Sequence, residues 1–223
     1  MAGRTFAIGD VHGCDLALRT LCEGLALTAE DRLILLGDLV DRGPNSRGVI
    51  EYAISLQEQC ELICLMGNHE EMMLRSFDSR PIFEYWMMAG GRQTLDSYDR
   101  DINQIPLSHR EFLSGGRDYF ETKTEIFVHA NLEPGIPLEA QTVDWLRWRH
   151  LTESESPHES GKRIICGHTQ QPSGRPLVFD GWVCLDTAAY KGNPLTCLET
   201  VTNTCFRATE RGEWLPPQEL LRL

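Results

Sequence analysis

The chain lacks any apolar run that approaches the roughly 20 residues of a membrane-spanning helix, and it has no excess of positive charge. Its 21 Lys and Arg residues are outnumbered by 33 Asp and Glu residues, so the formal net charge is −12 at pH 7. General binding to nucleic acid or to an anionic membrane calls for a basic face, so we expect neither partner. A small anionic substrate remains open, because bound metal ions reverse the field locally.

The chain also lacks a Cys-x-x-Cys pair, although it contains eight cysteines. Most of them lie in apolar context, which favours reduced, buried thiols of a cytoplasmic protein over disulfides or a zinc site. Cys14 and Cys166 adjoin the motifs described below, and packing is preferred for both over a redox role. The first residues enter a strand at once without the plan of a signal peptide, so we expect a cytoplasmic location.

No internal repeat, low-complexity tract or long linker divides the 223 residues. The composition, with 41% hydrophobic and 24% charged residues, is ordinary for a globular protein that buries a substantial core. We therefore expect one domain over residues 1–223. The sequence leaves the oligomeric state open, with a monomer favoured.

The first third of the chain alternates apolar runs with segments of helical spacing. These patterns predict strands at 5–8, 32–36 and 61–66 and helices at 16–25 and 46–59. Continuous apolar strands separated by helices indicate a mostly parallel sheet covered on both faces. Such sheets bind ligands beyond the carboxyl ends of their strands.

The remainder of the chain is mixed. Residues 70–114 are predicted to be helical, with a break at Gly90-Gly91, and a further helix is predicted at 142–151. Further strands are predicted at 125–128, 163–166, 177–179, 182–185, 195–201 and 205–208. We expect the short strands after residue 168 to form a second, more antiparallel sheet, with Asp180-Gly181 as a hairpin turn.

Four short motifs and one lone histidine each follow an apolar run. They are Gly9-Asp10-Val11-His12-Gly13, Gly37-Asp38-Leu39-Val40-Asp41-Arg42-Gly43, Gly67-Asn68-His69-Glu70, His129 and Gly167-His168-Thr169. Taken singly, an Asp after a strand is usually a turn residue, and a lone His is usually a satisfied core residue. Hard oxygen ligands and imidazoles gathered from several strand ends, however, suit two divalent ions roughly 3.5–4 Å apart that share an acidified water.

The motifs resemble the GDxHG, GDxVDRG and GNHE signatures of the phosphoprotein phosphatases, which belong to the calcineurin-like metallophosphoesterase superfamily. Two isolated metal histidines follow these signatures in that family. The resemblance runs from residue 6 to about 198 and is nearest to the compact bacterial and bacteriophage lambda-like serine/threonine phosphatases. Residues 90–98 are similar to their inter-motif helix. The resemblance implies an α/β fold, a β-sandwich of two mixed sheets flanked by helices.

The resemblance implies the metal ligands. It assigns Asp10 and His12 to the first ion and Asp38 to a bridge between the two. The second ion would be bound by Asn68, His129 and His168. Mn²⁺ is the expected metal, and iron, zinc or magnesium could occupy the same ligands.

The resemblance also implies the catalytic and substrate-binding residues. His69 would be the general acid that protonates the leaving oxygen, and Asp41 would orient and stabilise it. Arg42 would clamp the phosphoryl oxygens, with Asn68 beside it. A second phosphate arginine follows a Trp in the family, and both Arg147 and Arg149 qualify.

Two motifs depart from wider superfamily patterns. His129-Ala130-Asn131 stands where His-Gly-Gly or His-Ala-Gly is usual, and Gly167-His168-Thr169-Gln170 lacks the second histidine of Gly-His-x-His. The missing histidine agrees with the phosphoprotein-phosphatase and dinucleotide-hydrolase branches and argues against the phosphodiesterase branches that use it.

The resemblance therefore implies hydrolysis of phosphoserine, phosphothreonine and small phosphate esters, through direct attack by a metal-bridging hydroxide. The alternative is a symmetrical dinucleoside tetraphosphate hydrolase, a branch that shares GDxHGC, since Cys14 follows Gly13 here. That branch typically has GDLVARG and GNHD, whereas this chain has Asp41 and Glu70. A catalytically silent scaffold ranks low, because no ligand and no acid histidine has been lost.

Overall fold

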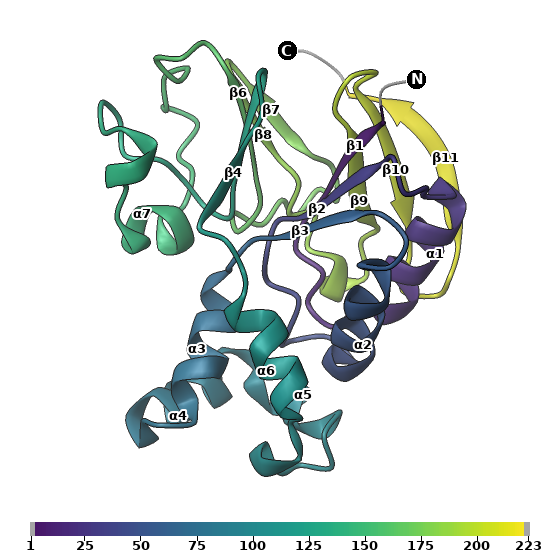
Figure 1. Cartoon of the computed structure of the whole chain (residues 1–223), viewed down its shortest axis with the longest axis vertical. Coiled ribbons are helices and arrows are strands. Elements are labelled where there is room, and N and C mark those ends of the chain that lie inside the picture. The colour runs from purple at the N-terminus through teal and green to yellow at the C-terminus, as the bar shows by residue number, and fades with distance from the viewer. Residues whose placement is uncertain (1–2, 221–223) are drawn as a thin grey trace.

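Two β-sheets pack face to face in the computed structural model, which describes residues 3–220 (Figure 1). The first sheet has the strand order β11 (Trp214–Glu219), β10 (Thr204–Ala208), β9 (Leu195–Glu199), β1 (Thr5–Ile8), β2 (Arg32–Leu35) and β3 (Glu61–Cys64). The β1–β2 and β2–β3 pairs are parallel, and the other pairs are antiparallel.

The second sheet is also mixed. Its order is β4 (Tyr119–Glu121), β5 (Glu125–Val128), β6 (Arg163–Cys166), β8 (Trp182–Cys184) and β7 (Leu177–Phe179). The β5–β6 and β6–β8 pairs are parallel, whereas β4 and β7 pair antiparallel at the two edges. The predicted fold class, an α/β sandwich of two mixed sheets flanked by helices, is confirmed.

The helices occupy three places around the sandwich (Figure 1). α1 (Asp15–Leu25) and α2 (Ser46–Leu56) lie against the first sheet, and α7 (Val143–Trp148) lies beside the second. The others gather beyond one end of the sandwich: α3 (Asn68–Ser76), α4 (Arg80–Trp86), the π-helix η1 (Met87–Gly91), α5 (Arg92–Asp96) and α6 (Leu107–Ser114). Three 3₁₀ turns complete the set: η2 (Ile102–Gln104), η3 (Leu138–Ala140) and η4 (Ala189–Lys191).

The central strands are apolar on both faces because both faces are buried. In β2, Leu33 and Leu35 pack toward α1 and α2, while Ile34 points to the other sheet and meets Phe127 and Ile165. Alternate residues therefore serve two different cores, as the period of two in a strand requires. A third core covers the outer face of the second sheet, under α7.

The predicted membership of the sheets is wrong in one respect. Residues 195–208 do not join the second sheet: β9 pairs antiparallel with β1, with Ala7 opposite Leu198, and brings β10 and β11 into the first sheet. Helices also cover only one face of that sheet, because the second sheet covers the other. The first sheet is parallel from β1 to the edge strand β3 and antiparallel from β9 to β11, whereas the second has a parallel centre and antiparallel edges. Local strand patterns do not encode this arrangement.

Two strands were missed. β4 has only three residues and lies at a sheet edge. β11 contains Pro216 and Pro217, which argue against a strand because proline cannot donate to the ladder. Prolines are tolerated here because β11 is the outermost strand and pairs with β10 across a register shift between Cys205 and Arg207.

The other predicted elements are close to those observed. The helix predicted at 46–59 ends at Leu56, and the one predicted at 142–151 is shorter, at 143–148. Residues 70–114 are largely helical, with the expected break at Gly90, whose φ is +128°. All eight cysteines are free thiols, and burial raises the pKa of Cys14 and of Cys166. None of the helices in residues 3–220 is long and apolar enough to cross a membrane.

One buried carboxylate ties the start of β1 to the turn before β2. The Asp31 side chain, 3% exposed, accepts hydrogen bonds from the backbone and guanidinium of Arg4 and from the backbone and hydroxyl of Thr28. The Arg4 guanidinium holds the pKa of Asp31 well below its usual range. We expect Asp31→Ala to lower the free energy of unfolding by about 2–4 kcal/mol, because several donors lose a charged acceptor.

Urea unfolding at pH 7 and at pH 3 checks this expectation. Because the pKa of Asp31 is depressed in the folded state, its contribution is complete above the usual carboxyl pKa and is lost as the pH falls toward the folded value. The difference between wild type and variant should therefore be larger at pH 7 than at pH 3. Equal urea midpoints at pH 7 would contradict the role given to Asp31.

Candidate metal centre

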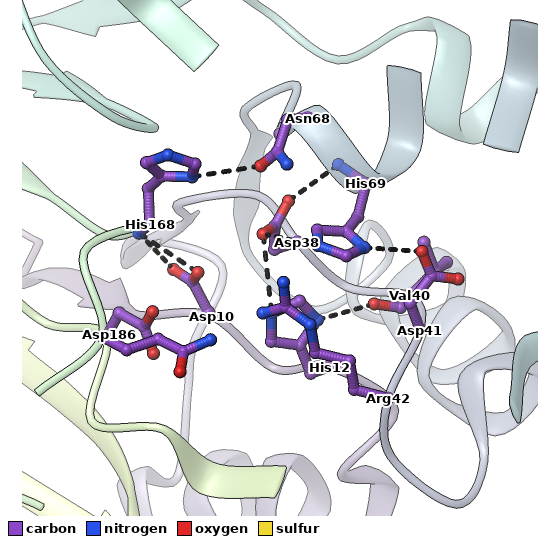
Figure 2. A network of polar contacts seen from close by, with 12 residues as sticks. Asp10, His12, Asp38, Val40, Asp41, Arg42, Asn68, His69, His168 and Asp186 are labelled. Atoms are coloured by element: carbon purple, nitrogen blue, oxygen red, sulfur yellow. Dashed lines mark hydrogen bonds and ion pairs between the residues drawn. The ribbon is translucent and has the colours of Figure 1, made fainter. Parts of the chain in front are cut away.

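The six predicted ligands lie together where parallel strands end. Asp10 and His12 follow β1, Asp38 follows β2, and Asn68 begins α3 after β3. In the second sheet, His129 follows β5 and His168 follows β6. Figure 2 shows Asp10, His12, Asp38, Asn68 and His168 around a common space between the two sheets and α3.

Asp38 is at the centre of this group. Its Oδ2 lies 3.5 Å from His12 Nε2, and its Oδ1 lies 3.4 Å from His129 Nε2. Two clusters of potential metal ligands contain it, namely His12, Asp38 and His69, and Asp38, His129 and His168. Each carboxylate oxygen therefore faces a different cluster, which is the geometry that a bridging carboxylate needs.

The three histidines outside the His69 pair are fixed in one tautomer each. His12 Nδ1 lies 2.8 Å from the Val40 carbonyl, and His129 Nδ1 lies 2.8 Å from the Leu36 carbonyl. His168 Nε2 lies 3.0 Å from the Trp148 carbonyl. A carbonyl only accepts, so each of these nitrogens carries the proton and the other ring nitrogen presents a lone pair. Burial lowers the pKa of His12 and His129 and lowers that of His168 to about 3, which keeps all three neutral.

The inward-facing atoms are consequently acceptors that approach other acceptors. Asn68 Oδ1 lies 3.1 Å from His129 Nε2 and 3.1 Å from His168 Nδ1, and none of the three carries a proton in these tautomers. A cation among them satisfies acceptors held this close in a buried site. Neutral imidazoles with carboxylate and amide oxygens are a donor set that suits Mn²⁺, Fe, Zn or Mg, so the residues present fit a divalent metal pair.

Buried carboxylates crowd the same space. Asp10 accepts the His168 backbone N–H with both oxygens, at 3.0 and 3.1 Å. Burial, with Asp186 and Asp38 nearby, raises the pKa of Asp10 well above its usual range. Asp186 follows β8, and its pKa is raised to about 6, chiefly by burial. Within residues 3–220 its buried Oδ2 has no hydrogen-bond partner.

Asp186 was not predicted as a site residue. A signal existed, because Leu185-Asp186 continues an apolar run in the same way as the other motifs. No glycine or histidine accompanies it, however, and an isolated Asp after a strand is more often a turn residue. One of its oxygens does act as in an ordinary turn, since Asp186 Oδ1 accepts a hydrogen bond from the Ala188 backbone N–H at 2.9 Å.

The backbone around Asp38 is held by Glu70. This buried side chain accepts the N–H groups of Asp38, Leu39 and Gly67 at 2.8, 2.7 and 3.0 Å. Burial, together with Asp38, raises the pKa of Glu70 to about 7. Asp38 itself has a left-handed φ of +50°, a conformation that needs such support in a residue with a Cβ. A Cβ at Gly67 would lie 2.2 Å from Asp38 Oδ1, which explains the glycine.

His69, a member of the first cluster, forms a buried pair with Asp41 (Figure 2). His69 Nδ1 lies 2.6 Å from Asp41 Oδ2, and His69 Nε2 points toward Asp38 Oδ2 at 3.9 Å. Trp86 Nε1 and Thr94 Oγ1 donate to the Asp41 carboxylate at 2.9 and 2.7 Å. Burial opposes protonation of His69, but Asp38 and Asp41 outweigh it and raise the pKa of His69.

Of the three predicted phosphate arginines, the structure brings only Arg42 to the metal centre. Its Nη1 lies 2.8 Å from His12 Nε2, and it borders a pocket of about 490 Å³ that Asp38, Asn68 and His168 also line. Arg147 lines no part of that pocket and pairs with Glu71 at 3.3 Å and with Asp118 at 2.5 Å.

Arg149 lies apart from the metal centre as well. It is exposed, and its guanidinium carbon lies 5.2 Å from the centroid of the Trp145 ring. The backbone of the same segment contributes to the metal centre instead, because the Trp148 carbonyl fixes the tautomer of His168. His150 contributes too, because its ring stacks on His168 at 4.4 Å and lines the pocket.

The chain is similar in sequence to symmetrical bis(5'-nucleosyl)-tetraphosphatases of pseudomonads. It is 44% identical over 136 residues to the protein of Pseudomonas fluorescens strain Pf-5 and 40% identical over 131 residues to that of Pseudomonas entomophila strain L48. Each match covers 58% of this chain but only 43% of the relative. The matched segment thus spans less than half the length of these curated relatives.

Solved structures share the fold at low sequence identity. A structure assigned provisionally to the diadenosine tetraphosphatases has a TM-score of 0.71 and 20% identity, over 93% of this chain and 94% of that one. The cold-active protein-tyrosine phosphatase of a psychrophilic Shewanella species has a TM-score of 0.67 and 18% identity, over 96% of this chain and 80% of that one. At these identities the likeness is one of fold alone.

The family described as calcineurin-like phosphoesterase matches residues 3–199, which include both sheets' central strands and every residue of the two ligand clusters. Because this match extends over most of the chain, the protein belongs to the calcineurin-like phosphoesterase family.

Proposed function

We propose that this protein hydrolyses phosphoric esters or anhydrides with the help of two divalent metal ions, Mn²⁺ first among them. The convergence of unprotonated imidazole nitrogens on Asp38 and Asn68 carries the proposal. The residues proposed as ligands are Asp10, His12, Asp38, Asn68, His129 and His168. Two such ions, when bound, supply a nucleophilic water at neutral pH and neutralise the charge that develops on the phosphoryl group.

The chain's own residues supply proton transfer and positioning. Asp41 accepts from Nδ1, and the charges of Asp38 and Asp41 raise the pKa of His69 and so favour a second proton at Nε2; we propose that His69 protonates the leaving oxygen. Arg42 has donors free to face two phosphoryl oxygens, as a planar guanidinium does well. Because Arg147 and Arg149 lie outside the pocket, the proposal gives the phosphate contact to Arg42 and not to them.

The first candidate substrate is a symmetrical dinucleoside tetraphosphate. The names of the relatives that are at least 40% identical support it, and they favour this alternative over the serine/threonine phosphatase that the motifs alone suggest. Symmetrical cleavage of such a substrate by water breaks the central phosphoanhydride and yields two nucleoside diphosphates. Because the match covers only part of those relatives, their activity comes to this chain as a proposal.

A second candidate is a phosphomonoester of serine or threonine, and the Asp41–His69 pair favours it. A serine or threonine alkoxide is a poor leaving group, so its departure depends on a proton from a well-placed acid. A nucleoside diphosphate leaves more easily and depends on that proton less. The charged pair of His69 with the fully buried Asp41 is therefore of more use to the monoesterase.

A competition assay with Mn²⁺ at neutral pH separates the two candidates. We expect diadenosine tetraphosphate to have a kcat/KM at least tenfold above that of a phosphoserine or phosphothreonine peptide, a preference of about 1.4 kcal/mol in the transition state. Adenosine diphosphate should be the nucleotide product. A chelator should abolish both activities. A tenfold preference in the opposite direction would establish the phosphatase instead.

A further inference from the structure

A second pocket adjoins the metal centre at Arg42. It has a volume of about 350 Å³, and Arg42, Met88, Arg92, Gln93 and Tyr190 contribute to its lining. Arg42 also lines the pocket that contains the proposed metal ligands. The two pockets therefore meet at Arg42, and the proposed chemistry does not use the second one.

The π-helix η1 builds one wall of this pocket and holds Arg42. The Gly90 carbonyl accepts the Arg42 backbone N–H at 3.2 Å, and a Cβ at Gly90 would lie 2.7 Å from Arg42 Cγ. The φ of Gly90, +128°, is also one that other residues rarely adopt. Here the irregular turn joins α4 to α5, so that Arg92, at the start of α5, faces the same pocket as Arg42.

The pocket is cationic in an acidic chain. No acidic side chain is among its lining residues, and Lys191 lies beside it, with Nζ 5.4 Å from the Tyr190 ring centroid and 2.7 Å from Gln170 Oε1. Within the described part of the chain, Arg42, Arg92 and Lys191 have no carboxylate within 4.0 Å, and nine of the seventeen arginines there do. With a net charge of −12, the protein leaves these cations unneutralised next to its reactive site.

We propose that this pocket binds a second phosphate group of the substrate, one that is not hydrolysed and is linked to the phosphate at the metal centre. The inference rests on the proposed function and specifies it, because only a substrate with several phosphates can fill both spaces. Arginine suits the role, since its planar fork matches phosphate oxygens. A local cationic cluster is also needed to draw a polyanion to an acidic protein. A phosphomonoester leaves the pocket unused.

The test compares Arg92→Gln with wild type on two substrates, at saturating Mn²⁺. Arg92 is exposed and has no ion pair within residues 3–220, so the variant should keep the wild-type thermal midpoint. We expect kcat/KM for diadenosine tetraphosphate to fall about tenfold, mainly through KM, as the loss of one charge-assisted contact implies. Hydrolysis of p-nitrophenyl phosphate should stay within about twofold of wild type. Arg92→Lys should recover most of the loss.

Arg211→Gln is the matched control. Arg211 is exposed in the turn before β11, lines neither pocket, and loses the same charge on substitution. This variant should change kcat/KM for neither substrate. If Arg211→Gln weakens diadenosine tetraphosphate hydrolysis as much as Arg92→Gln does, net charge and not the pocket explains the effect, and the proposal falls.

A binding arm tests the pocket even if diadenosine tetraphosphate is not a substrate. At fixed free Mn²⁺, calorimetry and inhibition of p-nitrophenyl phosphate hydrolysis give the affinities of inorganic tripolyphosphate and orthophosphate. We expect tripolyphosphate to bind wild type more tightly than orthophosphate, and Arg92→Gln to weaken only tripolyphosphate, about tenfold. Equal weakening of both anions, or no weakening of tripolyphosphate, would overturn the proposal. Failure of the dinucleotide assay alone would overturn only the substrate proposed above.

Discussion

The substitution Asp38→Asn is expected to lower kcat/KM on the order of 10³-fold and to reduce bound metal below one ion per chain. Asn keeps the size of the side chain and one oxygen, which can still accept the His69 backbone N–H now bonded to Oδ1 at 3.1 Å. It loses the charge and the second oxygen, the one that faces His12 Nε2. Both ligand clusters contain Asp38, so both ions lose affinity at once, together with the electrostatic stabilisation they give the transition state.

The control for Asp38→Asn is Asp10→Asn, because Asp10 belongs to neither of the two ligand clusters that contain Asp38. We expect that variant to keep close to one ion and measurable activity. Metal content by elemental analysis and kcat/KM on p-nitrophenyl phosphate are measured together for both proteins. An Asp38→Asn protein that retains two ions, or that loses no more metal than Asp10→Asn, would rule out the bridge.

The positions of the proposed ligands were predictable because each ligand lies just after an apolar strand. Asp38 and His129 follow apolar runs more than 90 residues apart, and the sequence does not show which strands are neighbours. Parallel strands nevertheless bring their carboxyl ends to one edge, whatever their order. The wrong assignment of residues 195–208 to the second sheet therefore did no harm to the site, since β9 and β10 contribute no predicted ligand.

The surroundings of the ligands were not predictable in the same way. Asp41 depends on Trp86 and Thr94, which are 45 and 53 residues away in a helical segment without a polar motif of its own. The tautomer of His168 depends on a backbone carbonyl, that of Trp148, and carbonyls leave no mark on a sequence. Such contacts arise from the packing of α3–α6 and α7 around the strand ends, so only the folded chain shows them.

The structure also shows that Glu70 and Asp41, whose identities favoured a phosphatase over a dinucleotide hydrolase, play different parts in the site. Glu70 accepts four backbone N–H groups around Asp38 and does not line the pocket. The Glu70 carboxylate therefore supports the loop around Asp38. Asp41 is different because it contacts His69 directly. Of the two features that argued for a phosphatase, only Asp41 bears on the chemistry, which is why the relatives' names prevail in the proposal.

His69→Asn is expected to lower kcat roughly 10²–10⁴-fold, the usual contribution of a general acid, while two ions stay bound. The structure supports an acid because Asp41 accepts a hydrogen bond from Nδ1, Asp38 and Asp41 raise the pKa of the ring, and Nε2 points into the centre. The loss should be smallest for p-nitrophenyl phosphate, whose leaving group needs little protonation, and larger for an alkyl phosphate. The control is His158→Asn. His158 lies in the loop before β6 and outside the pocket that Asp38 and Asn68 line, so this variant should change neither kcat nor metal content.

Metal content decides between two roles for His69. Its Nε2 belongs to the same cluster as His12 and Asp38, so the geometry alone would also allow a ligand. A ligand must present a lone pair at Nε2, whereas an acid must carry a proton there, and the two charged neighbours Asp38 and Asp41 favour the proton. One contrary result is that His69→Asn loses one ion along with its activity. Another is that its kcat falls equally for alkyl and aryl phosphates. In either case His69 is a ligand, and the proton for the leaving group comes from elsewhere.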